Sequence, residues 1–142
     1  MNIAFSTCHG FPPYAGFIQR TIRGLSRFDY GRFEICTEGD GIDRWIEYKS
    51  LSRLNKHKPY LPDNREELRP LLAGLKSAGK EIAVWSHELW APTAVLDVYP
   101  ELRTAKDDIN LAHPLLSEFI RDKYRQLFAA MPEIDSIVLT MT

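Results

Sequence analysis

The chain has 142 residues, of which 44% are hydrophobic, 11% aromatic and 26% charged, a composition typical of one globular domain with a substantial core. Its net charge of −1 gives no general electrostatic reason to bind nucleic acid or an anionic membrane. No apolar stretch reaches the roughly 18 residues of a membrane helix, and the N-terminus lacks a secretory signal. We therefore expect a single cytoplasmic domain over residues 1–142, with neither nucleic acid nor membrane as a partner.

The first part of the chain predicts a strand, a helix and a second strand. Residues 2–8 are short and apolar-rich, as expected for a strand. Apolar residues then recur every three or four positions over 17–28, which indicates one buried face of a helix. Residues 32–37 alternate and predict a second strand. Its alternation places Phe33 and Ile35 on one face, and the acidic and cysteine side chains on the other.

A long connection over 39–62 follows the second predicted strand. Its aromatic content favours a functional loop over a disordered one. The next segment, 63–79, has leucines at helical spacing and predicts a helix. Asp63 followed three residues later by Glu66 has the spacing of a capping box, and Gly79 is typical of a helix end.

The last part of the chain repeats the same alternation. Residues 81–86 predict a third strand, and 87–112 form a second long connection rich in aromatic residues and prolines. Pro114 suits the first position of a helix, and apolar residues keep helical spacing over 114–128. The final apolar run, 134–142, predicts a fourth buried strand.

The predicted order β-α-β-α-β-α-β indicates an α/β fold with parallel strands joined by right-handed crossovers. Open doubly wound sheets and (β/α)₈ barrels share this order, but the long loops after the second and third strands favour the barrel. A complete barrel needs about 250 residues. We therefore expect a half (TIM) barrel, whose two open edge strands would favour self-association.

Polar residues follow each of the first three predicted strands. His9 follows the first strand, Glu38 and Asp40 the second, and His87 and Glu88 the third. In a parallel α/β protein these positions converge on one rim, where carboxylates and imidazoles can bind a polar ligand or transfer protons. Asp40 could instead be a turn residue without contact to a ligand. Because neighbours on a strand face opposite ways, only one residue of the 87–88 pair can face the site.

The tryptophans and cysteines have different expected roles. Trp45 and Trp90 lie in the long connections, where flat aromatic rings could cover the apolar face of a sugar, with loop packing as an equal alternative. Trp85 lies within a predicted strand and is expected in the core. Cys8 and Cys36 lack the spacing of a metal-binding pair. We expect them to be small buried hydrophobic residues and not a disulfide or metal pair. We expect neither a metal nor a cofactor, since no phosphate-binding, serine-hydrolase or zincin motif occurs.

Four stretches in the second half of the chain match a known pattern: His113 to Leu116, Phe119 to Phe128, Pro132 to Asp135 and Ile137 to Thr140. They resemble the third helix and fourth strand of glycoside hydrolase barrels. Among these, they are similar to the α-glucuronidases and the family-20 β-hexosaminidases. Gly10 to Pro13 and Glu34 to Asp40 resemble, more loosely, the end of the first strand and the end of the second.

The resemblance implies glycoside hydrolysis by paired carboxylic acids, one of which protonates the leaving oxygen. In these enzymes the general acid follows the fourth strand, a place that would come just after Thr142. No catalytic residue is therefore carried over to this chain, and whether it is an enzyme by itself stays open. The residues already named after the second and third strands are carried over as candidate sugar-binding positions.

Two other hypotheses fit the same sequence. The first is a complete, non-catalytic α/β module that binds a small polar ligand or a partner protein. The second is a small cysteine-dependent enzyme built on Cys8 and His9.

Overall fold

The strands and long helices alternate as the sequence predicts. A computed structural model describes residues 4–7, 15–25, 27–36, 42–58, 63–87 and 94–140. The strands in this part of the chain are β1 (Ala4–Thr7), β2 (Arg32–Cys36), β3 (Glu81–His87) and β4 (Ser136–Thr140). The long helices between them are α1 (Ala15–Leu25), α2 (Arg65–Ser77) and α4 (Pro114–Ala130).

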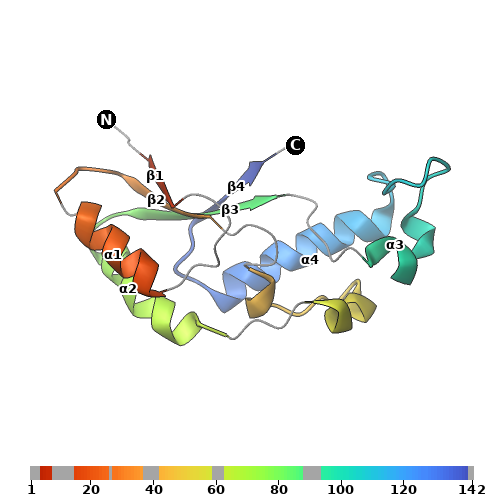
Figure 1. The fold of residues 1–142 in the computed structure, drawn as a ribbon, viewed down its shortest axis with the longest axis horizontal. Helices are drawn as coiled ribbons and strands as arrows, with labels where there is room; N and C mark the ends of the chain where they lie inside the picture. Colours follow the sequence, from red (N-terminus) through yellow and green to blue (C-terminus); the bar gives the residue numbers. More distant parts are fainter. Residues whose placement is uncertain are drawn as a thin grey trace.

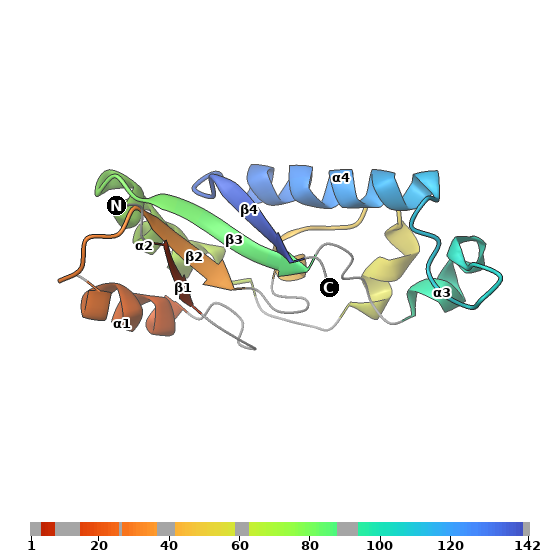
Figure 2. The ribbon, with the colours of Figure 1, turned by 90° about the horizontal axis from the view of Figure 1, so that it is seen from above.

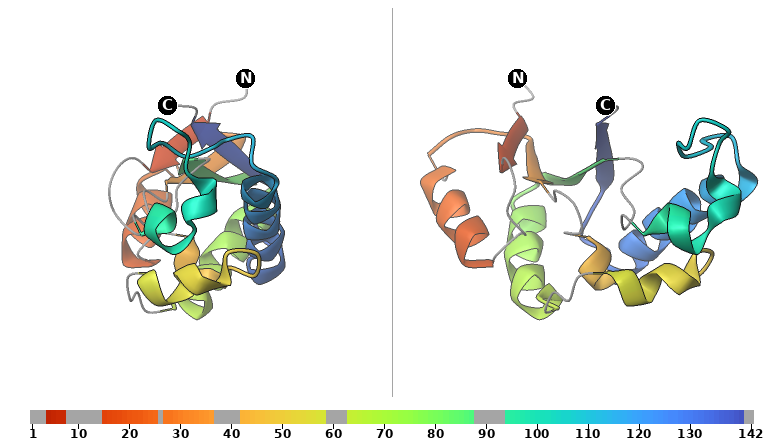
Figure 3. Two further views of the ribbon diagram at one scale, coloured as in Figure 1. Left: turned by 90° about the vertical axis from the view of Figure 1, so that its right-hand side faces the viewer. Right: turned by 45° about the vertical axis from the view of Figure 1, so that its right-hand side comes forward.

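The sheet is open and parallel, and its strands follow one another in chain order, β1-β2-β3-β4. Phe33 lies in register with Ile82, and Val84 with Ile137. A right-handed crossover between neighbouring parallel strands places the connecting helix on a fixed side of the sheet. With every step in the same direction, α1, α2 and α4 lie together on one face (Figures 1 and 3). The predicted parallel α/β fold is confirmed at this level.

The hydrophobic core lies between the sheet and these helices. Phe33 and Ile35 of β2 are buried, which confirms their predicted common face. Each fully buried aliphatic or aromatic side chain contributes about 1.5–3 kcal/mol through removal of apolar surface from water. The other buried side chains of this layer include Ile82, Val84, Leu68, Leu72, Leu75, Phe119 and Leu127.

The described parts of the two long connections fold into a compact extension of the core. Their short helices are η1 (Asp43–Trp45), η2 (Ser52–His57), α3 (Val95–Val98) and η3 (Pro100–Leu102). We call residues 42–58 and 94–113 the lateral lobe, because they lie to one side of the sheet along α4 (Figure 2). The ring of Tyr48 packs edge-on against that of Phe119 of α4, with centroids 4.9 Å apart. The lobe therefore shares one hydrophobic core with the sheet.

The start of α2 differs from the predicted capping box. The residue before the helix is Asn64, not Asp63, and its side chain caps no backbone N–H. Its Oδ1 instead accepts a hydrogen bond from Nε1 of Trp45, 2.9 Å away. Asp63 accepts a bond from the backbone N–H of Arg65 at 3.0 Å and pairs with its guanidinium at 2.6 Å. The hydrogen bond between Trp45 and Asn64 thus takes the place of the capping box predicted at Asp63.

The end of α2 confirms the predicted stop at Gly79. Gly79 has a φ of +73°, a left-handed conformation that strains residues with a side chain. Its N–H donates to the carbonyl of Lys76 at 2.9 Å, and the N–H of Lys80 donates to that of Leu75 at 3.0 Å. This pair of bonds is a Schellman motif, which satisfies the last carbonyls of the helix and leads the chain into β3.

Two glycines of this region should respond oppositely to alanine. We expect Gly79→Ala to lower the free energy of unfolding by about 1 kcal/mol, because alanine is strained at positive φ. Gly74 lies inside α2 with open space around its Cα, so Gly74→Ala should raise stability by roughly 0.5–1 kcal/mol. Urea unfolding of the two variants beside the wild type measures both effects, and equal changes would contradict the assigned helix end.

Candidate functional site

The sheet has a second face on which none of the described helices lies (Figure 1). Tyr124 of α4 donates a hydrogen bond to Oγ of Ser86 over 3.3 Å, so Ser86 faces the helices. Side chains alternate along a strand, so the residues on either side of Ser86 in β3 face the other way. We call this second side the open face; its described side chains are Arg32, Glu34, Glu81, Ala83, Trp85, Ser136 and Val138.

At the N-terminal end of the strands the open face carries a polar cluster. Glu81 accepts hydrogen bonds from Oγ of Ser136 at 2.8 Å and from Nε of Arg32 at 3.0 Å. Nη1 of Arg32 also lies 3.7 Å from Oε1 of Glu34. The hydrogen bond from Ser136, followed by that from Arg32, lowers the pKa of Glu81. One carboxylate thus links β2, β3 and β4 on the side away from the helices.

The lowered pKa of Glu81 predicts a pH-dependent contribution to stability. A carboxyl whose pKa falls below its unfolded value of about 4.5 stabilises the fold above that value, and the contribution is lost as the pH falls through the folded pKa. We expect Glu81→Gln to reduce the loss of stability between pH 6 and pH 3, measured as the shift in the urea midpoint. Glu47→Gln, at an exposed carboxylate outside the cluster, is the control. Identical pH profiles for wild type and Glu81→Gln would exclude this coupling.

Toward the C-terminal end of the strands the open face carries the aromatic side chain of Trp85. Trp85 lies in register between Cys36 of β2 and Val138 of β4. Its side chain is partly exposed, unlike the expected core position. His87, one of the predicted binding residues, is the last residue of β3 and lies in register with Thr140.

The other predicted binding residues divide into two groups. Trp45 is 4% exposed, and its indole N–H is bonded to Asn64, so the structure places its ring in the packing of the lateral lobe. This is the loop-packing alternative weighed for that residue. The remaining predicted positions lie outside the described residues, and their roles stay predictions: His9, Glu38, Asp40, Glu88 and Trp90.

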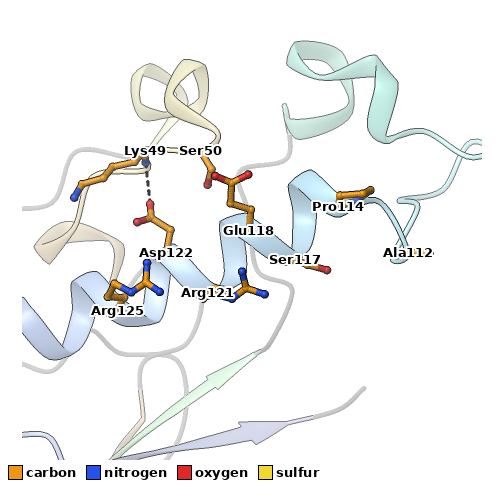
Figure 4. Close-up of a pocket in the computed structure, with 9 residues that line it drawn as sticks. All are labelled: Lys49, Ser50, Ala112, Pro114, Ser117, Glu118, Arg121, Asp122 and Arg125. Carbon is orange, nitrogen blue, oxygen red and sulfur yellow. Dashed lines mark hydrogen bonds between the residues drawn. The ribbon is translucent and has the colours of Figure 1, made fainter.

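A separate groove lies between α4 and the lateral lobe (Figure 4). It has a volume of about 860 Å³ and is open to solvent. Asp122 of α4 joins its two walls, because Oδ2 accepts bonds from the backbone N–H of Lys49 at 3.2 Å and from Nε2 of Gln126 at 2.8 Å. Along the described part of the chain, the side chains of Lys49, Arg121 and Arg125 enter no ion pair. The groove therefore offers three cationic groups, beside the carboxylates of Glu118 and Asp122, to a strongly polar ligand.

Sequence reasoning did not find this α4 groove. Lys49 and Arg121 are 72 positions apart in the chain, and each alone is an ordinary exposed basic residue. No motif or spacing connects the two residues, so the groove could not be predicted from the sequence. Both line the groove because the lateral lobe packs on α4 (Figure 4).

Other classes of site have no support in the described residues. Histidine, cysteine and acidic side chains there form no group of three that could hold a metal ion. None of the described helices is long and apolar enough to cross a membrane. No protein-family model matches the chain, and neither a curated protein nor a solved structure gives a significant match.

Proposed function

We propose that this chain is one half of a (β/α)₈ barrel of the glycoside hydrolase type, which binds a carbohydrate at the C-terminal ends of its strands. The observation that carries the proposal is the winding of the sheet, with parallel strands in chain order and the helices on one face. Barrels wind in this way, whereas a doubly wound sheet reverses direction and receives helices on both faces. The cytoplasmic location expected from the sequence belongs to the same proposal.

The sequence positions of the polar residues support a ligand site at this end. Glu88 directly follows His87, the last residue of β3, and Glu38 comes two residues after Cys36, the last of β2. Barrel enzymes bind their ligands on loops at this end of the strands. Carboxylates accept hydrogen bonds from sugar hydroxyls, and the ring of Trp90 would cover an apolar sugar face. The proposal is limited to carbohydrate binding, because no residue of this chain is assigned as a catalytic acid.

A binding screen tests this proposal directly. Saturation-transfer difference NMR of the purified chain with methyl pyranosides and their oligosaccharides should identify at least one bound sugar. Glu88→Gln should then weaken that sugar about tenfold, because a charge-assisted hydrogen bond to a hydroxyl is lost. Glu47→Gln, at an exposed carboxylate of the lateral lobe, is the matched control and should bind as the wild type does. A wild type that binds no sugar of the panel would refute carbohydrate binding.

The α4 groove supports a second candidate, a non-catalytic module that binds a small polar ligand. Its supporting observation is the set of cationic groups with no ion pair among the described residues. The same screen separates the two candidates through the double variant Arg121→Ala/Arg125→Ala. If the ligand binds at the ends of the strands, the double variant should still bind it. If the ligand binds in the α4 groove, the double variant should lose binding and Glu88→Gln should keep it.

The open sheet also supports the proposed self-association. β1 and β4 are the outer strands of the sheet, and Leu139 of β4 is 48% exposed. An edge strand presents unpaired backbone groups, and apolar side chains beside them favour pairing with another chain. We propose that a second copy covers this edge.

Sedimentation velocity over a range of concentrations tests the edge. The wild type should associate as its concentration rises, and Leu139→Lys should shift the population to the monomer, because a lysine would be buried in the contact. Phe28→Lys is the control, since Phe28 is 66% exposed but lies after α1, away from β4. Loss of association in both variants alike would point to general hydrophobic contact, and a monomeric wild type would remove the proposal.

A further inference from the structure

We propose that Trp85 is a sugar-binding residue, whose indole ring forms the surface against which the bound pyranose stacks. This inference rests on the proposed function and adds a residue to it. Sequence reasoning expected Trp85 in the core, so its assignment depends on the sheet.

The first observation is the direction and exposure of the side chain. Ser86 faces α4 through its hydrogen bond with Tyr124, so Trp85 faces the open side of the sheet. Ile82, Ala83 and Val84 before it are fully buried, and Ser86 after it is 5% exposed. Trp85 alone among these five consecutive positions stays partly accessible to solvent. A large aromatic ring that is partly exposed, beside buried neighbours at 82–84 and 86, presents apolar surface that a ligand can contact.

The second observation is the position of Trp85 on the sheet. β3 is an inner strand, so Trp85 is flanked on both sides, by Cys36 and Val138 in register. It precedes the end of β3 by two residues, close to where the predicted binding residue Glu88 follows in the sequence. A ring at this place lies centrally at the end of the sheet where the proposed sugar binds.

The third observation is the change in chemistry along the open face. The next row toward the N-terminal end holds Ala83 between Glu34 and Ser136, all small or polar. Beyond that row lies the ion pair of Glu81 and Arg32. The open face thus pairs one flat apolar surface with hydrogen-bonding groups. A pyranose has the same two surfaces, since its C–H face is apolar and its rim carries hydroxyls, and indole is the largest aromatic surface a side chain can offer.

The experiment compares tryptophan variants in the sugar-binding screen. With the best-bound pyranoside of the panel as probe, Trp85→Ala should lower the affinity about tenfold or more. Trp85→Phe should lose about threefold, because a smaller ring still stacks. Trp45→Phe is the matched control at a buried tryptophan: it should lower the unfolding midpoint, through loss of the bond to Asn64, and leave the affinity unchanged. Circular dichroism of each variant verifies the fold.

The outcomes distinguish this inference from the proposal on which it rests. If the wild type binds and both Trp85 variants bind equally well, Trp85 has no contact with the sugar and the inference fails while carbohydrate binding stands. If Trp85→Ala does not fold, two other measurements test whether Trp85 contacts the sugar. These are the affinity of Trp85→Phe and the quenching of indole fluorescence by acrylamide. Bound sugar should protect Trp85, so the protection seen in the wild type should shrink in Trp85→Phe. A wild type that binds no sugar overturns both.

Discussion

The structure depends on one constraint, the fixed hand of the crossover between neighbouring parallel strands. Because β1, β2, β3 and β4 follow chain order, each crossover turns the same way and the helices collect on one side. The hydrophobic core can then form only between the sheet and that layer of helices. The opposite face of the sheet carries charged, hydroxyl and aromatic side chains beside Ala83 and Val138, and no described helix packs on it. The candidate property of that face, ligand binding, follows from this division.

The long helix α4 connects the two parts of the molecule. Its C-terminal half packs beside the sheet, where Tyr124 contacts Ser86, and the lateral lobe packs along the same helix through Phe119, Asp122 and Gln126. The lobe packs on this helix through a hydrophobic interior and through backbone N–H groups that donate to α4 side chains. The described parts of the two long connections, residues 42–58 and 94–113, are therefore positioned by this helix. In the proposed function, the lobe stands beside the end of the sheet where the ligand binds.

Much of the fold could be predicted because its signals are local. The alternation of Phe33 and Ile35 with polar neighbours and the glycine that ends α2 each depend on a few adjacent residues. The start of α2 could not be predicted in the same way, because Asn64 bonds to Trp45 from a segment far away in the chain. Trp85 was expected in the core for a related reason. Residues 82–85 are apolar at every position, so their pattern does not say which side is buried.

The sequence by itself determined the order and type of the elements, because backbone periodicity and end signals act over one or two turns of chain. It also indicated which polar residues follow the strands. The tertiary structure alone decided that the sheet winds in one direction, that Trp45 is enclosed while Trp85 stays partly accessible, and that Lys49 and Arg121 line one groove. These features arise when segments distant in the chain pack together, and packing depends on the shape and burial of both partners, which no local pattern contains.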